Sequence, residues 1–495
     1  MSTNPAEASG LAVLTEAERA GFSSRGYSDE VLPIPPTQRP WGTKNFITVW
    51  MGPIHNILSY FTVVGFFALG LNALQVVGAI LIAAVIVSIG YVLNGRAAAK
   101  YGIPFAMQIR DTFGVKGAIV PAMIRGLIAG FVFFGLTTIS SAQALDIVFD
   151  RIFPGYLQLG GGTTLLGLAI PTAISYLIMA VITVVLYLAG QKFIDKFSNW
   201  ASPAVWVLMV IGLFLAVSNA GGLGNVLSYH PVPSTPVTVV GFITCVSMLV
   251  SNWAGPIVNI GDLTRNAKST SDPVRGFPIG MLVSYLLFAA VTIGFMASLS
   301  AVSGGAIDVN KPTIFVDAIN SIGNPFVVIL LILAMNVGAT AFVVFGNMLP
   351  SGLQLTAQFP KLFSVKTGGL VAAVVGTLIL PWQFVQNTTM LYLFYSFIGS
   401  MFGPIAGIML ASYYFERRQQ LDLDTIYAEP GTDGGHPGGV NWRAVGVLIV
   451  SFVITMAGKA LPGVALLATI NSWAFFCGLA IGFVGYLLVG TRRRA

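Results

Sequence analysis

Residues 50–56 are Trp-Met-Gly-Pro-Ile-His-Asn, and residues 253–259 are Trp-Ala-Gly-Pro-Ile-Val-Asn. The two stretches agree at five of their seven positions, and each lies in a long apolar run. Proline removes a backbone donor and clashes with the preceding helical turn, and glycine is a poor helix former. We therefore predict two helices broken at corresponding places, at Gly52 and Pro53 and again at Gly255 and Pro256.

The chain around these stretches is apolar almost throughout. Of the 495 residues, 55% are hydrophobic and 9% are charged, whereas about a quarter of the residues of a soluble protein are charged. A run of about 20 apolar residues can cross a bilayer as a helix. The sequence predicts an all-α polytopic membrane protein with twelve spans, at roughly 44–70, 73–97, 117–149, 163–189, 197–219, 236–260, 277–303, 325–350, 367–383, 389–415, 442–461 and 464–490.

The placement of lysine and arginine tests this count. If the residues before the first span are cytoplasmic, 21 of the 25 basic residues fall on the cytoplasmic side, three fall outside, and Arg125 lies within the third span. The positive-inside rule describes this asymmetry. We expect a multi-pass protein of the cell (inner) membrane with both termini cytoplasmic, and no nucleic-acid binding, since topology accounts for the net charge of +7.

The domain organisation follows from the same pattern. The polar, proline-rich residues 1–43 predict a disordered cytoplasmic tail, 44–490 a transmembrane domain, and 491–495 a basic cytoplasmic C-terminus. The broken helices are the first and the sixth, five apart, so the second copy has the opposite orientation in the membrane. This predicts inverted repeats at about 44–219 and 236–415, followed by two helices at about 442–490.

Corresponding breaks in two halves of a membrane protein indicate a transporter binding site near the bilayer midplane. Broken backbone at that depth is tolerated only where it is buried in protein or lines a cavity. The alternative is two independent proline kinks, which would not explain the shared tryptophan, isoleucine and asparagine.

Further motifs resemble the nucleobase:cation symporter family, in its branch of allantoin permeases and hydantoin transporters. The similarity covers nearly the whole chain after residue 40 and is carried by WMGPIHN (50–56), NGRAAAKYGIPF (94–105), NIGDLTR (259–265), FPKLFSVKTG (359–368), PWQF (381–384), GPIAGIML (403–410) and GVNWRA (439–444). The resemblance implies a LeuT-type fold with ten core helices in two inverted five-helix repeats. It also implies import of a small planar nitrogen heterocycle, such as a nucleobase, hydantoin or allantoin.

The resemblance also implies the substrate-binding residues. Asn56 matches a position that contacts substrate, Trp253 the tryptophan on which the ring stacks, and Asn347 an asparagine that hydrogen-bonds the ring. An indole face stacks on a planar ring, and a carboxamide offers a donor beside an acceptor. The alternative is that Trp253 is packing and that both asparagines cap broken helix ends.

Two positions of the third span depart from the family pattern. Relatives carry Trp-x-Gly-x-Gln, whereas this chain has Phe133-Phe134-Gly135-Leu136-Thr137. Phe133 keeps an aromatic face without an N–H group, and Thr137 is shorter and has no amide. The substrate is therefore expected to differ from hydantoin and allantoin in the edge that a glutamine would contact.

The residues at the positions of the family's sodium site also differ from the family pattern. Its backbone carbonyls map to Gly52, His55 and Gly338, but its two side-chain hydroxyls map to Ala341 and Phe342, which cannot ligate a hard cation. We expect a proton, or no ion, to be coupled in preference to sodium. His55 could carry the proton, or it could be a neutral histidine hydrogen-bonded in the gap.

Two further charged positions leave alternatives open. Arg125 could be a functional charge in the membrane, but we expect it to snorkel from the inner end of its span. Asp262 and Arg265 form either an inner-gate salt-bridge network or a solvated helix end.

Enzyme motifs are absent from the sequence, with no H-E-x-x-H, no Gly-x-Ser-x-Gly with partner residues and no Cys/His cluster. We expect no enzyme activity, no cofactor and no metal, and partners limited to a small solute and the bilayer, with the chain acting as a monomer. A transporter of a ring-containing vitamin or its precursor, and a transport-inactive solute sensor, remain alternatives.

Overall fold

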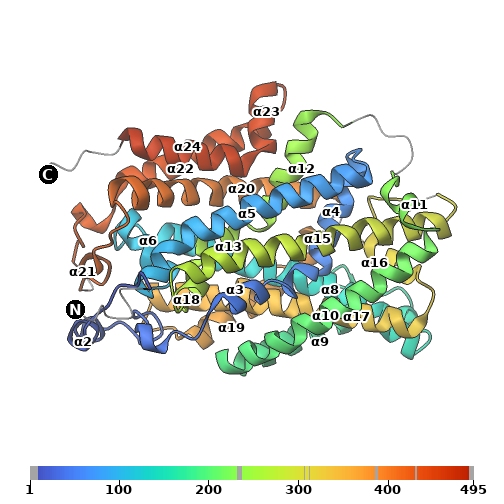
Figure 1. Ribbon diagram of the computed structural model, residues 1–495, viewed down its shortest axis with the longest axis horizontal. Coiled ribbons are helices and arrows are strands. Elements are labelled where there is room, and N and C mark those ends of the chain that lie inside the picture. Colours follow the sequence, from blue (N-terminus) through green and yellow to red (C-terminus); the bar gives the residue numbers. More distant parts are fainter. Residues whose placement is uncertain are drawn as a thin grey trace.

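The computed structural model describes residues 9–230, 237–305, 307–311, 313–384, 388–429 and 432–489. In these ranges most of the long helices lie alongside one another (Figure 1). Eight are each long and apolar enough to cross a membrane, and a ninth candidate is a pair of helices bent by 95°. Three shorter apolar helices occupy the expected first, sixth and ninth spans. The all-α polytopic membrane fold is confirmed.

The first repeat contains α3 (Thr43–Thr48), η2 (Pro53–His55), α4 (Ile57–Ala68), α5 (Ala73–Tyr101), α6 (Phe105–Phe113), α7 (Ile119–Met123), η3 (Ile124–Ala129), α8 (Gly130–Ile152), α9 (Ile170–Leu188) and α10 (Gln191–Asn219). The second contains α12 (Val239–Asn252), α13 (Ala254–Asn259), α14 (Gly261–Thr264), α15 (Ser271–Val302), α16 (Ile314–Asn320), α17 (Pro325–Val343), η5 (Val344–Met348), α18 (Leu349–Gln358), α19 (Val365–Leu378), η6 (Pro381–Phe384), α20 (Thr388–Ala411) and η7 (Ser412–Glu416).

The remaining elements follow the repeats or connect their helices. The last helices are α22 (Trp442–Ala460), α23 (Ala465–Ser472) and α24 (Ala474–Val489). Two elements, α2 (Glu16–Ser24) and η1 (Pro36–Gln38), precede the first repeat. The connecting elements are η4 (Tyr156–Gln158), α11 (Leu223–Leu227), α21 (Leu423–Ile426), η8 (Pro437–Gly439) and an antiparallel pair of short strands, β1 (Thr164–Leu165) and β2 (Leu168–Ala169).

Both predicted helix breaks are present, and each lies just before its proline. In the first span, α3 ends at Thr48 and Pro53 begins the single turn η2. In the sixth, α12 ends at Asn252, and Pro256 lies in the first turn of α13. Proline is tolerated in a first turn, where its missing N–H has no partner to lose. The prolines therefore restart the helices that the preceding residues interrupt.

Two other spans are interrupted by π-helical turns, which the sequence analysis did not predict, and a third such turn, η7, ends the tenth span. The turn η3 joins α7 to α8 in the third span, and η5 joins α17 to α18 in the eighth. A π-turn widens the helix and turns the following side chains relative to the preceding ones, and such turns are frequent at functional sites. Both turns contact α18.

The prediction of a disordered tail at 1–43 is wrong for residues 9–43, while residues 1–8 and 491–495 lie outside the described part of the chain. Thr15 caps α2 in a reciprocal capping box with Glu18. Phe22, Tyr27 and Leu32 are buried in a second hydrophobic cluster with residues of α5, α6, α18 and α21. Proline-rich composition suggested disorder, but contacts with distant segments order this segment.

Arginine side chains donate hydrogen bonds to backbone carbonyls of residues 9–43, called the N-terminal segment below. Arg265 donates to the carbonyls of Glu30 and Leu32 at 2.8 and 3.0 Å, and Arg39 donates to Ile34 and Ala99. The end of the molecule formed by residues 9–43 with α6 and α21 is called the N-terminal end below, and α2 and α21 mark it in Figure 1.

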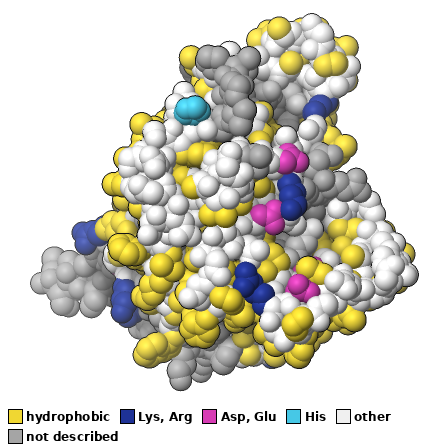
Figure 2. Space-filling model, turned by 90° about the vertical axis from the view of Figure 1, so that its right-hand side faces the viewer, with side chains coloured by type: hydrophobic (Ala, Val, Ile, Leu, Met, Phe, Trp, Pro, Cys, Tyr) yellow, Lys and Arg dark blue, Asp and Glu magenta, His cyan; other side chains and the backbone are white. Residues whose placement is uncertain are grey.

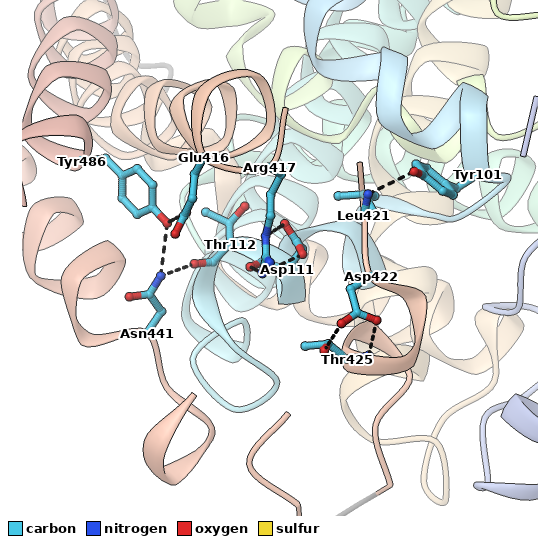
Figure 3. Close-up of polar contacts among 10 residues, drawn as sticks. All are labelled: Tyr101, Asp111, Thr112, Glu416, Arg417, Leu421, Asp422, Thr425, Asn441 and Tyr486. Atoms are coloured by element: carbon cyan, nitrogen blue, oxygen red, sulfur yellow. Dashed lines mark hydrogen bonds and ion pairs between the residues drawn. The ribbon is translucent and has the colours of Figure 1, made fainter. Parts of the chain in front are cut away.

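The chain between α20 and α22 is fixed to the same end (Figure 3). Arg417 forms an ion pair with Asp111 of α6, with 3.0 Å between nitrogen and oxygen. The Tyr486 hydroxyl donates to Glu416 at 2.6 Å, and the Asn441 amide donates to the Thr112 carbonyl at 2.7 Å. Figure 2 shows the opposite end, where charged side chains are few and scattered.

Candidate functional site

The two copies of the repeated stretch meet at the centre of the protein. The rings of Trp50 and Trp253 lie edge to face with centroids 5.2 Å apart, and both side chains are buried. Neither indole N–H has a hydrogen-bond partner. Trp50 was not among the predicted site residues, although its place in the repeat was a signal that could have indicated it.

Trp253 is surrounded by aromatic rings. Tyr285 and Phe342 also contact it edge to face, with centroids 6.2 and 5.4 Å away. Its position follows from the break, because Trp253 is the residue that separates α12 from α13. A tryptophan there places an indole with an unpaired donor at the interruption, enclosed by three other aromatic rings.

Asn347 lies within the π-helical turn η5 and is buried. Its side-chain amide nitrogen has no hydrogen-bond partner. Capping of a broken helix end does not describe this residue, because η5 continues directly into α18. Asn347 therefore retains donor capacity that a ligand could use.

Asn56 differs, because its hydrogen bonds are mostly taken. It is the N-cap of α4, and its side-chain oxygen accepts from the backbone N–H of Ser59 at 2.9 Å. Its amide donates to the carbonyl of Pro53 and to the Ser59 hydroxyl. Of the two asparagines implied by the resemblance, Asn56 has the geometry of a helix cap.

Phe133 and Thr137 lie one turn apart on α8, and both are buried. The Phe133 ring contacts Phe394 of α20 at a centroid distance of 5.3 Å. The Thr137 hydroxyl has no hydrogen-bond partner. α8 also contacts α4 and η5, which carry other candidate residues or lie next to them.

The carbonyls mapped to the sodium site do converge. A β-carbon placed on Gly338 would lie 2.6 Å from the carbonyl oxygen of Gly52 and 3.2 Å from that of His55. Only glycine allows the first and eighth spans to approach this closely. The unwound first span thus presents two oxygens to α17 at one point.

The side chains expected to complete that site do not supply oxygen. Ala341 is apolar, and the ring of Phe342 packs against Trp253 and beside Gly346. The neighbouring Thr340 hydroxyl donates to the carbonyl of Asn336 at 2.8 Å. Thr340 also lines a crevice between α8, α9 and α17 together with Leu145 and Ile178.

His55 is fully buried among aromatic rings. Its Nδ1 lies 2.6 Å from the Tyr60 hydroxyl, and its ring neighbours Trp206 and Phe288. Nε2 has no hydrogen-bond partner. The surroundings offer one hydroxyl and aromatic surfaces, which suit a neutral imidazole.

The other charged candidates are bound differently from both alternatives considered above. Asp262 accepts from the backbone N–H of Phe105 and from the Asn259 amide, both at 2.8 Å, and Arg265 binds the N-terminal segment. Both are buried, so neither forms a solvated helix end. The expectation that Arg125 snorkels is wrong, because its side chain has no exposed surface.

Two helices interrupted at corresponding places, with buried donors around the interruptions, are typical of membrane transporters of small solutes. A family model described as permeases for cytosine/purines, uracil, thiamine and allantoin matches residues 33–478. The chain belongs to this family. The resemblance drawn from the sequence motifs is thereby confirmed, as is the assignment to secondary transport.

Two relatives and one solved structure match along nearly their full length. The chain is 35% identical to the putative allantoin permease of Escherichia coli, over 97% of this chain and 98% of the relative. It is 31% identical to the allantoin permease of Bacillus subtilis, over 94% of each. Mhp1, a nucleobase-cation-symport-1 family transporter solved closed with bromovinylhydantoin bound, is similar with a TM-score of 0.76 and 25% identity, over 93% of this chain and 94% of Mhp1.

Proposed function

We propose that this chain imports a small planar nitrogen heterocycle that bears ring carbonyls, of the allantoin, hydantoin or oxo-nucleobase kind, by alternating access. The observation that carries the proposal is the pair of unpaired donors, the Trp253 indole and the Asn347 amide, at the interrupted sixth span and the π-turn of the eighth. An aromatic face with adjacent donors complements a flat ring with a carbonyl edge.

The relatives support the ring class, since two of them are named allantoin permeases and another, from Microbacterium maritypicum, is named a hydantoin permease. At Phe133 and Thr137 the site differs from the family pattern. Phe133 provides a second aromatic face, and the Thr137 hydroxyl takes the place of a longer amide. We expect a somewhat larger or differently substituted ring than hydantoin to fit here.

Uptake into proteoliposomes tests this function. Radiolabelled allantoin, hydantoin, uracil, hypoxanthine and thiamine are supplied outside, with protein-free liposomes as the control. Accumulation of at least one oxo-ring above the control is expected. Accumulation of thiamine alone would favour the vitamin alternative, and saturable binding without uptake of any ring would favour the sensor.

We further propose that sodium is not the coupling ion and that His55 stays neutral. The support is the apolar pair Ala341 and Phe342, together with the aromatic surroundings of His55, where an imidazolium would have one hydroxyl partner. A buried unpaired charge is costly in the membrane. The transporter then runs as a facilitator or takes protons by another route.

The proposed orientation has the N-terminal end in the cytoplasm, as the charge asymmetry favours. Ser24 and Thr432 are exposed, so single cysteines there should resist an impermeant thiol reagent added to intact cells and react after permeabilisation. In the loop between α20 and α22, Thr432 is a better position for the cysteine than Gly434, because a β-carbon on Gly434 would lie 2.4 Å from the Val115 side chain. Labelling of either cysteine in intact cells would contradict this orientation.

A further inference from the structure

Arg125 is a buried charge that the proposed transport mechanism does not yet use. It lies in the π-turn η3 of the third span, and its side chain has no exposed surface. Charged side chains within membrane spans are rare and mostly functional. Its contacts therefore decide whether it holds the fold together or also binds a ligand.

The guanidinium joins three spans. Its Nε donates to the Asn259 side-chain oxygen at 2.8 Å, and Nη2 donates to the carbonyl of Gly346. Asn259 in turn donates a hydrogen bond from its amide to Asp262. Arg125 is thus separated from the nearby carboxylate by a carboxamide, and its third nitrogen, Nη1, has no partner.

The position of the guanidinium is next to the proposed solute site. A β-carbon placed on Gly255 would lie 3.3 Å from Cζ of Arg125, and Gly255 is two residues after Trp253. On the other side, Gly346 directly precedes Asn347. The guanidinium of Arg125 therefore lies beside the same interruption and the same π-turn that carry the stacking ring and the amide.

An unpaired nitrogen alone would not distinguish Arg125, because Arg39, Arg110 and Arg265 each leave one nitrogen without a partner too. Those three lie at the N-terminal end and bind carbonyls of the N-terminal segment, α5, α18 and α21. Of the four, Arg125 is the one whose guanidinium contacts Gly255 and Gly346, close in sequence to Trp253 and Asn347, which have unpaired donors of their own. Arg125, Trp253 and Asn347 offer donors, so a ring that binds all of them needs acceptors.

We infer that Arg125 is a substrate-binding residue whose Nη1 donates to a ring carbonyl or oxyanion of the solute, so that the site selects oxo-rings, neutral or anionic, over their amino counterparts. The inference rests on the proposed function. A guanidinium recognises carbonyl and oxyanion groups strongly and has no acceptor for an amino group. A site with a buried donor discriminates strongly against a ring that lacks the matching acceptor, because the donor is then left unpaired.

The experiment uses matched rings that differ mainly in one group, uracil against cytosine and hypoxanthine against adenine, with urate as an anionic oxo-ring. Dissociation constants are measured on the purified wild type, Arg125→Gln, Arg125→Lys and Asn259→Ala, with melting temperatures alongside. Arg125→Gln should weaken binding of the oxo-rings tenfold or more and change binding of the amino rings less than threefold. Asn259→Ala, which removes a partner of Nε but leaves Nη1, should keep the oxo-ring preference.

Unchanged oxo-ring affinity in Arg125→Gln would overturn the inference, as would an equal loss for both members of each pair. An Asn259→Ala variant that loses the preference as fully would also overturn it, since Arg125 would then act through the sixth span. If Arg125→Gln does not fold, Arg125→Lys is the deciding variant. Its single ammonium cannot reproduce the planar fork of donors, so binding of neutral oxo-rings should also weaken. If the wild-type protein takes up no ring, the proposed function is wrong, independently of the results with the variants.

Discussion

Each buried arginine at the N-terminal end leaves one nitrogen unpaired but binds other segments through the rest, whereas the Trp253 and Asn347 side-chain nitrogens at the centre have no hydrogen-bond partner. Arg110 donates to the Tyr27 hydroxyl at 2.7 Å and to the Ala357 carbonyl at 2.8 Å, and Arg265 binds two further carbonyls. At the centre, Trp253, Asn347 and Arg125 each keep a donor without a partner. The end is organised for cohesion between segments, and the centre retains capacity for a ligand.

The difference has an energetic consequence. A buried donor left without an acceptor costs about 1–3 kcal/mol, and at the centre the Trp253 indole and the Asn347 amide nitrogen carry this cost with no hydrogen bond to offset it. A ligand that supplies acceptors would recover part of this free energy. The comparison therefore predicts that mutations at the end lower stability, whereas mutations at the centre lower affinity.

The largest effect is expected for Arg110→Ala. This residue joins the N-terminal segment, α18 and the Ile426 carbonyl of α21, and its loss leaves those acceptors buried. We expect the free energy of unfolding to fall by roughly 3 kcal/mol, measured as a lower melting temperature of the purified protein.

The matched control is Arg19→Ala. Arg19 pairs with Asp29, whose side chain is largely exposed, and an exposed pair contributes about 0–1 kcal/mol. If Arg110→Ala melts no earlier than Arg19→Ala, the N-terminal end does not have the cohesive role assigned to it.

Trp253→Ala comes next and should act on affinity. Removing the ring on which the solute stacks should weaken binding by about 1–3 kcal/mol, by analogy with base–aromatic stacking, while expression is unchanged. Titration of the purified variant with the ring that the wild type accumulates measures the loss. Trp442→Ala, at a largely exposed position of α22, is the control, and equal losses in both variants would remove Trp253 from the site.

The two asparagines sharpen the comparison within the centre. Asn56 caps α4, so Asn56→Ala should lower stability by about 1 kcal/mol, the usual contribution of a cap. Asn347→Ala removes an unpaired amide and should lower affinity with little change in melting temperature. Reversal of this pattern would mean that Asn56 is the ligand-binding residue of the two.

Much of this architecture could be predicted from the sequence. The apolar runs gave the spans, the basic residues supported their number, and the repeated stretch located the two breaks. The order of residues 9–43 could not be predicted in the same way, because it depends on contacts with distant parts of the chain, such as that of Arg265 with the carbonyl of Glu30. The Thr15 and Glu18 capping box was the one local signal for α2.

The centre was predictable in composition but not in detail. Sequence motifs indicated Trp253 and Asn347, yet the π-turns that orient Arg125 and Asn347 have no reliable signature in a single sequence. Without η3, the position of Arg125 near the start of its span suggested an outward, snorkelling side chain. Its inward direction depends on Asn259 and Gly346, which are neighbours only in the folded chain.

The smallest expected effect is that of sodium on transport. Two carbonyls, of Gly52 and His55, still converge on Gly338, so part of a cation site is built. A sodium ion must exchange its water shell for enough protein oxygens, and unwound carbonyls supply only part of that set. Ala341 adds none, the Phe342 ring packs against Trp253, and Thr340 faces the crevice with Leu145.

Uptake by proteoliposomes should therefore change less than twofold when sodium is replaced by choline. A double variant, Ala341→Ser with Phe342→Thr, restores both hydroxyls beside the existing carbonyls and should make substrate affinity rise with sodium concentration. Thr340→Val serves as a control, because its hydroxyl already donates to Asn336 and its loss should leave sodium without effect. A clear sodium dependence in the wild type would show that the missing hydroxyls are replaced elsewhere. Abolition of that dependence by Thr340→Val would identify the residue that replaces them.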